Sequence, residues 1–412
     1  MLGDSGFGPP PRRRGSGNVL THILMAVLGA AVAIGLLLSF YSPSGGLSLP
    51  GSGAVPSPAT SAAPLTGGEQ AIITKVKPGL VVINATLQYD SEIAAGTGMV
   101  INADGLVLTN NHVIDDSTKI TATVVATGKA YTATVVGYDV TGDVALIQLQ
   151  GASGLTTVPV GNSAAVRVGD SVVALGNAEG QGSITATAGQ VTGLDQTITA
   201  SDQGGSTASE TLYGMIQTSA DIVSGDSGGP LAGPAGVIGM DTAGNDAGDQ
   251  QAATGFAIPV NTALSIARQI AGGQASPVIT IGYPPFMGIF IASGSSSSPQ
   301  AQQQQEEQQN GGFGSSQACY TSNADVTVPS AIASVGSGTL IIGTICGSPA
   351  ASAGMTGGAV ITAVNGQAVG SPDDLSGILS RFHPGDTISV TWVSPSGQRT
   401  TSSMDLAAGP PQ

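Results

Sequence analysis

A serine set among glycines is the residue of this sequence with the clearest chemical potential. In the stretch 225–231 (Gly-Asp-Ser-Gly-Gly-Pro-Leu), the glycines let backbone come close to Ser227, because they carry no Cβ. A serine hydroxyl becomes a useful nucleophile only when a neighbouring base takes its proton. The sequence must therefore also supply a histidine and an acid that orients it.

The sequence has three histidines, and their surroundings differ. His22 lies inside an apolar run near the N-terminus, and His383 lies just before a Pro-Gly pair where we expect a helix to end. His112 follows a β-type run of apolar residues at 105–109. Because only this position suits a catalytic base, we predict His112 to be the general base.

Two aspartates compete for the role of the acid. Asp143 opens the apolar run 144–147, which has the character of a buried strand, whereas Asp139 has no such run directly after it. Asp143 is therefore the preferred acid, with Asp139 as the alternative.

These blocks, in the order His, Asp, Ser, resemble the chymotrypsin-like serine proteases and, among them, the HtrA (DegP-like) branch. The resembling stretches are 96–101, 108–114, 143–146 and 225–231. The resemblance implies a mainly β fold: a double six-stranded β-barrel protease domain with the active site between the barrels, then an α+β PDZ domain. It implies a serine endopeptidase.

The resemblance also assigns the oxyanion hole to the backbone N–H groups of Gly225 and Ser227. In zymogen-type relatives the aspartate matching Asp226 pairs with an N-terminus made by cleavage. No activation sequence of that kind is found before this domain, so we expect loops or a ligand to order the oxyanion hole.

Residues 69–272, which we assign to the protease domain, read as an all-β unit followed by one helix. Short β-branched runs alternate with turn residues, as in β-sandwiches and barrels. Apolar residues at helical spacing then predict a helix over 260–271.

Residues for substrate recognition follow from the same resemblance. In the family, the strand at 236–243 pairs with the extended substrate, which makes Met240 and Thr242 candidate substrate-binding residues. Asp221 departs from the HtrA pattern, which usually has a small residue six positions before the nucleophile. In trypsin that position selects lysine or arginine, so Asp221 is a candidate specificity residue. A solvated or capping aspartate is the alternative.

The C-terminal part, residues 280–407, resembles a PDZ domain. A loop that binds a peptide's C-terminal carboxylate matches Phe286, Met287, Gly288 and Ile289. A helix over 373–382 would form the other wall of the groove. A β module without a ligand is the alternative.

Within this part, residues 293–317 are rich in serine and glutamine, and their composition predicts a disordered insertion. The sequence has two cysteines, Cys319 and Cys346. Because the domain is expected outside the membrane, we predict a disulfide between them.

The apolar run Val19–Phe40 carries no charge and would form a helix about 33 Å long, enough to cross a hydrocarbon core of about 30 Å. We assign residues 19–41 to a transmembrane helix. The arginines at 12–14 then place residues 1–18 in the cytoplasm and both domains outside it. A cleaved signal peptide is the competing interpretation, although no clean cleavage site follows. Residues 42–68 would be a flexible linker.

The composition limits the kinds of partner and ligand that the protein could bind. A net charge of −15 with 11 Lys+Arg argues against nucleic-acid binding. Cysteines and histidines do not cluster, so we expect neither a metal nor a cofactor. The expected substrates are unfolded or damaged proteins, with peptides bound at the PDZ groove, and HtrA relatives are commonly homotrimers. A peptide-binding, chaperone-like module with little or regulated proteolysis is the alternative function.

Overall fold

The computed structural model describes residues 65–87, 92–201, 209–244, 254–292, 296–310, 313–314, 317–322 and 325–411. The predicted membrane segment 19–41 and most of the predicted linker lie outside these residues. In the described part of the chain, no helix is long and apolar enough to cross a bilayer.

The first helix, α2 (Gly67–Val76), begins slightly before the predicted domain boundary because Thr66 caps it. The Thr66 hydroxyl accepts a hydrogen bond from the backbone of Glu69, and the Glu69 carboxylate accepts one from the backbone of Thr66. Such a reciprocal pair satisfies two N–H groups that a helix start leaves free. Ile73 and Val76 then anchor the helix in the core, and the short η1 (Lys77–Gly79) leads into the first strand.

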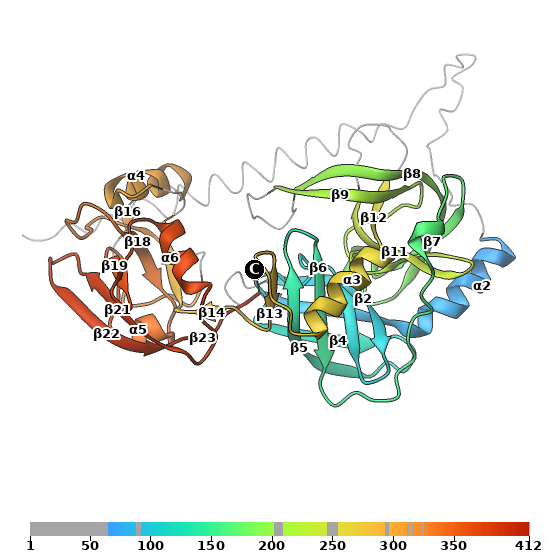
Figure 1. The fold of residues 1–412 in the computed structure, drawn as a ribbon, viewed down its shortest axis with the longest axis horizontal. Helices are drawn as coiled ribbons and strands as arrows, with labels where there is room; N and C mark the ends of the chain where they lie inside the picture. The colour runs from blue at the N-terminus through green and yellow to red at the C-terminus, as the bar shows by residue number, and fades with distance from the viewer. Residues whose placement is uncertain are drawn as a thin grey trace, which may run out of the picture. The chain divides into compact units, whose positions relative to one another are not determined.

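The first barrel forms from the next six strands (Figure 1). They are β1 (Leu80–Leu87), β2 (Glu92–Asn102), β3 (Leu106–Thr109), β4 (Lys119–Val124), β5 (Ala130–Asp139) and β6 (Val144–Leu149). The strands pair in the order β5-β4-β1-β2-β3-β6, and β5 also pairs with β6, so the sheet closes on itself. A later strand, β13 (Ile279–Ile281), adds to β5. Closure satisfies the strand edges and encloses a core of β-branched side chains.

The second barrel is also closed, in the order β10-β11-β12-β9-β8-β7. Its strands are β7 (Ser171–Gly176), β8 (Thr185–Ser201), β9 (Ser209–Thr218), β10 (Pro230–Gly233), β11 (Gly236–Gly244) and β12 (Gly255–Pro259), with short turns η2 (Ser163–Ala165) and η3 (Ala178–Gly180). The helix predicted over 260–271 is α3 (Val260–Ala271), which buries Ala263, Ala267 and Ile270.

The C-terminal domain contains a sheet in the order β15-β18-β19-β21-β22, with β20 beside β19. Its elements are β15 (Ile289–Ile291), β18 (Thr339–Thr344), α5 (Pro349–Ser352), β19 (Val360–Val364), β20 (Gln367–Ala368), α6 (Pro372–Leu379), β21 (Thr387–Val393) and β22 (Arg399–Asp405). A two-stranded pair, β14 (Pro285–Phe286) and β23 (Ala407–Ala408), joins the two ends of the domain. The helix predicted over 373–382 is α6, which buries Leu375 and Ile378.

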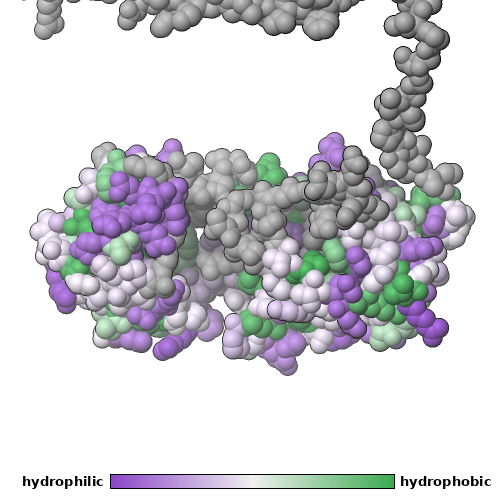
Figure 2. All heavy atoms as spheres, turned by 90° about the horizontal axis from the view of Figure 1, so that it is seen from above, coloured by the Kyte–Doolittle hydropathy of each residue, from purple (hydrophilic) through white to green (hydrophobic). Residues whose placement is uncertain are grey.

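The structure differs from the disordered insertion predicted over 293–317. Helix α4 (Pro299–Asn310) forms there, followed by the short strand β16 (Phe313–Gly314), which pairs with β17 (Val328–Pro329). Gln302 explains the difference, because its buried amide accepts a hydrogen bond from Leu340 N (2.8 Å) and donates one to Gly338 O (2.8 Å). The helix thus packs on the domain through a side-chain amide that bonds to backbone groups as a peptide group would. A polar composition alone does not reveal such a contact. Figure 2 shows the hydrophilic side chains that gather at this end of the domain.

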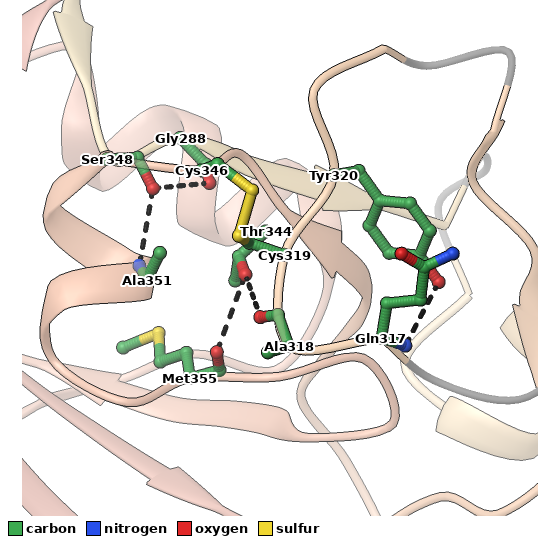
Figure 3. The surroundings of a disulfide bond; sticks show 10 residues. All are labelled: Gly288, Gln317, Ala318, Cys319, Tyr320, Thr344, Cys346, Ser348, Ala351 and Met355. Atoms are coloured by element: carbon green, nitrogen blue, oxygen red, sulfur yellow. Dashed lines mark hydrogen bonds between the residues drawn. A yellow bond between two sulfur atoms is a disulfide. The ribbon is translucent and has the colours of Figure 1, made fainter.

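Cys319 and Cys346 form a disulfide, the pair predicted from the sequence (Figure 3). The backbone N–H of Tyr320, beside Cys319, donates a hydrogen bond to Thr344 O (2.7 Å), and the carbonyl of Tyr320 accepts a hydrogen bond from Cys346 N (2.8 Å). The disulfide and these bonds attach the segment 317–322 to the end of β18.

Removing this disulfide with Cys319→Ser/Cys346→Ser is expected to lower the free energy of unfolding of the C-terminal domain by about 3–4 kcal/mol. The reason is that a cross-link over 27 residues restricts the unfolded chain. Fluorescence of Trp392, the sole tryptophan and part of this domain's core, would follow denaturant unfolding. Reduced wild type should match the variant, and an unchanged midpoint would contradict the expectation.

Candidate active site

His112 and Asp143 come together at one end of the first barrel. His112 lies in the turn after β3, and Asp143 directly precedes β6, which pairs with β3. The imidazole Nδ1 lies 3.0 Å from each carboxylate oxygen of Asp143, and the backbone N–H of His112 donates to Asp143 Oδ1 at 3.1 Å. The Asp143 side chain is 1% exposed and that of His112 is 26% exposed. A buried acid thus orients a base that solvent can reach.

The turn between β5 and β6 gives Asp139 and Asp143 different roles. Asp139 Oδ1 accepts a hydrogen bond from Gly142 N at 2.9 Å and so caps this turn, and burial raises the pKa of Asp139. The turn ends with Asp143 at φ 49°, an uncommon conformation for a residue with a Cβ. Asn110 Nδ2 donates to the backbone carbonyl of Asp143 at 2.9 Å. Asp139 therefore helps to shape the turn, and Asp143 contacts the histidine.

Thr242 joins the serine to this pair. It lies on β11 of the second barrel, and its hydroxyl donates a hydrogen bond to Asp143 Oδ2. The Ser227 hydroxyl donates to the backbone carbonyl of Thr242 at 3.2 Å. The predicted serine and the predicted acid are thus both bonded to one residue, although they belong to different barrels.

The loop before Ser227 has a conformation that requires glycine. Gly225 has φ 91°, and a Cβ there would lie 2.2 Å from the carbonyl oxygen of Asn177. In the described part of the chain, the N–H groups of Gly225 and Ser227 have no hydrogen-bond acceptor. Two free donors beside a nucleophile are what an oxyanion hole requires.

Two buried carboxyl groups lie next to this loop. Asp226 accepts a hydrogen bond from Val223 N at 3.0 Å through Oδ2, and its Oδ1 has no hydrogen-bond partner among the described residues. Asp241 on β11 is fully buried, and within the part of the chain that the structure describes neither of its carboxylate oxygens has a hydrogen-bond partner. Burial raises the pKa of Asp226 to about 6, against the opposing hydrogen bond from Val223 and with a small addition from the charge of Asp221. Burial and then the charge of Asp226 raise the pKa of Asp241.

Asp226→Asn is therefore expected to stabilise the protein at pH 8 and to have little effect near pH 4. The pKa of Asp226 in the folded protein, about 6, lies above the reference value of 3.8. The stability that protonated Asp226 contributes to the folded state is therefore fully present below about pH 4 and is lost as the pH rises through 6. The full shift corresponds to about 3 kcal/mol in the free energy of unfolding.

Denaturant unfolding from pH 4 to pH 8 measures this effect, with Ser227→Ala in every protein to prevent self-cleavage. Asp104→Asn, at an exposed position, is the control. A difference between Asp226→Asn and its parent that does not grow with pH would contradict the burial explanation.

The candidate substrate residues lie in different environments. Asp221 is exposed on the segment that leads to Ser227. Met240 does not fit the expectation, because its side chain is buried in the core and its backbone pairs with Pro230 on one side and Ile258 on the other. The pairing with β10 ends at Met240, and the backbone of Asp241 still bonds to Gly228 and Gly229. The edge of β11 that a substrate strand would need therefore begins at Thr242.

The candidate PDZ residues lie at the start of an edge strand. Phe286 belongs to β14, and Met287 is buried in the domain core. Gly288 has φ 74°, and its carbonyl accepts hydrogen bonds from Ile345 N (2.9 Å) and Ser348 Oγ (3.1 Å; Figure 3). Ile289 begins β15, whose other edge has no strand beside it in the described sheet. A peptide can add to such an edge.

Sequence reasoning missed several polar residues of the site. The hydroxyl of Thr242 contacts the acid, a role that the predicted substrate contact did not include. Asn110 contacts Asp143, and Thr97 contacts the loop at Gly225. A signal for Thr97 existed: a polar residue between two glycines in an otherwise apolar strand. Among the described residues, no group of histidine, cysteine or acidic side chains could hold a metal ion.

Comparison with known proteins identifies two domain families in the chain. Residues 96–240 match the model of the trypsin-like peptidase domain, and residues 342–393 match that of the PDZ domain. Serine protease PepD of Mycobacterium tuberculosis is 30% identical over 410 residues, which cover 95% of this chain and 76% of PepD.

Two relatives from Escherichia coli match over shorter stretches. The periplasmic pH-dependent serine endoprotease DegQ is 34% identical over 60% of this chain and 55% of its own length. The periplasmic serine endoprotease DegP is 38% identical over 44% of this chain and 37% of its own length. The chain is accordingly a serine endopeptidase. It belongs to the HtrA/DegP family of trypsin-like serine proteases with a C-terminal PDZ domain.

Proposed function

We propose that Ser227, His112 and Asp143 act as a catalytic triad that cleaves peptide bonds. Ser227 Oγ attacks the substrate carbonyl carbon while His112 Nε2 takes its proton, and His112 later gives this proton to the leaving amine. Asp143 accepts the hydrogen bond from Nδ1–H and so keeps the proton off Nε2, which can then act as the base. The observation that carries the proposal is the contact of His112 with both oxygens of the buried Asp143.

The charge that develops on the substrate oxygen would be bound by the N–H groups of Gly225 and Ser227. The Ser227 hydroxyl has one proton, which it donates to Thr242 O at 3.2 Å. Attack therefore requires the hydroxyl to turn from Thr242 to His112. Rotation about χ1 is the motion that redirects a serine hydroxyl.

The substrates that suit this site are unfolded or damaged proteins. A substrate that pairs with the β11 edge at 242–244 must be extended, and folded proteins rarely offer such strands. We further propose that the β15 edge binds peptides, that residues 19–41 anchor the chain in the membrane, and that both domains act outside the cytoplasm. The selection of a basic side chain by Asp221 and a trimeric assembly stay predictions.

Fluorophosphonate labelling and casein cleavage by the full-length protein test the proposal. Wild type should become labelled at Ser227 and should cleave unfolded casein, whereas Ser227→Ala should do neither. Failure of the wild type to become labelled would favour a peptide-binding module without regular proteolysis.

A further inference from the structure

The conformation of the loop 223–227 is held by groups outside it as well as inside it. A trans peptide points its C=O and N–H in opposite directions, so whatever binds a carbonyl also sets the direction of the N–H that follows. Ser224 O accepts a hydrogen bond from Glu179 N (2.7 Å), and Asp226 O accepts one from Gly229 N (2.8 Å). These two bonds direct the N–H groups of Gly225 and Ser227, the proposed oxyanion donors.

The two peptide groups next to these donors are both held by Thr97. The Thr97 hydroxyl donates to Gly225 O at 2.8 Å, and the Thr97 backbone N–H donates to Ser227 O at 2.9 Å. The peptide between Gly225 and Asp226 and the peptide between Ser227 and Gly228 are therefore fixed by one residue. The peptide that carries the Ser227 N–H lies between them.

Thr97 is itself firmly placed. Its side chain is fully buried, its hydroxyl accepts a hydrogen bond from Asn177 N at 2.9 Å, and its carbonyl accepts one from Thr109 Oγ1 at 2.7 Å. It lies on β2 of the first barrel, and Thr109 ends the strand that leads to His112. The residue that holds the serine loop is thus connected to the strand that positions the base.

An external hold is needed because the loop contains Gly225. Glycine crosses between positive and negative φ at little cost, so a peptide next to Gly225 can rotate unless its carbonyl is bound. Rotation of this peptide would disturb the neighbouring donor. The Thr97 hydroxyl binds the carbonyl that would have to turn.

We propose that Thr97 is a positioning residue for catalysis, whose hydroxyl holds the Gly225 peptide so that the two oxyanion donors stay directed at the substrate. This proposal rests on the proposed triad mechanism. It extends that mechanism by naming a residue that orders the oxyanion hole.

Thr97→Val in the full-length protein tests the proposal, because valine keeps the shape and removes the hydroxyl. With a fluorogenic peptide chosen from the casein fragments of wild type, kcat should fall about 10²–10³-fold, the loss typical of one oxyanion-hole donor. KM should stay within about threefold, because the substrate's ground state does not need the hole. Thr97→Ser, which restores the hydroxyl, should recover kcat to within about fivefold of wild type.

Thr218→Val is the matched control for lost stability. Thr218 is also fully buried, and its hydroxyl also donates to one backbone carbonyl (Gln190 O, 3.0 Å) and accepts from one backbone N–H (Ala220 N, 3.0 Å). It should lower the melting temperature about as much as Thr97→Val but leave kcat within about threefold of wild type. A loss of kcat as large as that of Thr97→Val would show a structural effect and overturn the proposal.

A peptide aldehyde gives a second measurement, since its adduct with Ser227 places an oxyanion in the hole. Thr97→Val should weaken inhibition by the aldehyde as much as it lowers kcat, and should leave inhibition by the corresponding peptide alcohol unchanged. Equal effects on both inhibitors would overturn the proposal. If Thr97→Val does not fold, Thr97→Cys, with a weakly donating thiol of similar size, decides the question by the same comparison.

The result also separates the two proposals. If Ser227→Ala retains hydrolysis, the triad mechanism itself is wrong. If hydrolysis needs Ser227 but Thr97→Val keeps the kcat of wild type, only the role of Thr97 is wrong.

Discussion

Ser227→Ala is expected to lower kcat for peptide hydrolysis by about 10⁶, the scale of loss when a triad nucleophile is removed. Alanine leaves no atom that can form an acyl-enzyme, so the remaining rate comes from the oxyanion donors and substrate binding alone. The single side-chain hydrogen bond that is lost joins the hydroxyl to Thr242 O, so the fold should be unaffected.

Active-site titration and initial rates on a fluorogenic peptide measure this effect, and thermal unfolding checks the fold. Ser224→Ala is a useful control, because Ser224 lies in the same loop and is exposed. Its contact with Glu179 is made by the backbone carbonyl, which the substitution keeps. It should retain most of the activity. Hydrolysis by Ser227→Ala above about 1% of the wild-type rate would mean that another group is the nucleophile.

Asp143→Asn is expected to lower kcat by about 10⁴ at neutral pH while the protein stays folded. The aspartate oxygens accept hydrogen bonds from His112 Nδ1, from His112 N and from the Thr242 hydroxyl. An asparagine can accept with one oxygen only, and its NH₂ group donates. The NH₂ group would favour the tautomer with its proton on Nε2, which cannot take a proton from Ser227.

The matched control is Asp139→Asn, in the same turn. Asparagine can still accept the hydrogen bond from Gly142 N that shapes the turn, so kcat should stay within about tenfold of wild type. Steady-state rates on the same peptide compare the two variants. A larger loss for Asp139→Asn than for Asp143→Asn would mean that Asp139 is the acid.

Local patterns were enough to select Ser227 and His112 as candidates for the nucleophile and the base. A nucleophile needs a glycine-rich approach and a base needs a place at the end of a strand, and both leave marks in short stretches of sequence. Helix α3 follows from local periodicity, and the all-β character of the domain follows from short strands and turn spacing, whereas the two barrels were expected from the family resemblance. The disulfide followed because the sequence has two cysteines and the domain was expected outside the membrane.

Other parts required the tertiary structure. Helix α4 was missed because glutamine composition indicates disorder, whereas the pairing of Gln302 with Leu340 and Gly338 depends on a strand far along the chain. Met240 was misjudged because its backbone pairs with β10 on one side and with β12 on the other. Sequence alone does not show on which side of a strand its neighbours lie.

By itself, the sequence determined the family resemblance and the candidates for the nucleophile, the base and a preferred acid, because these depend on residue types within short stretches. Only the tertiary structure decided that Asp139 caps a turn while Asp143 contacts His112. It also brought Thr242 to the acid and Thr97 to the serine loop. These contacts cross between two barrels, and hydrogen bonds between residues 99 and 128 positions apart leave no periodic or local pattern in a sequence.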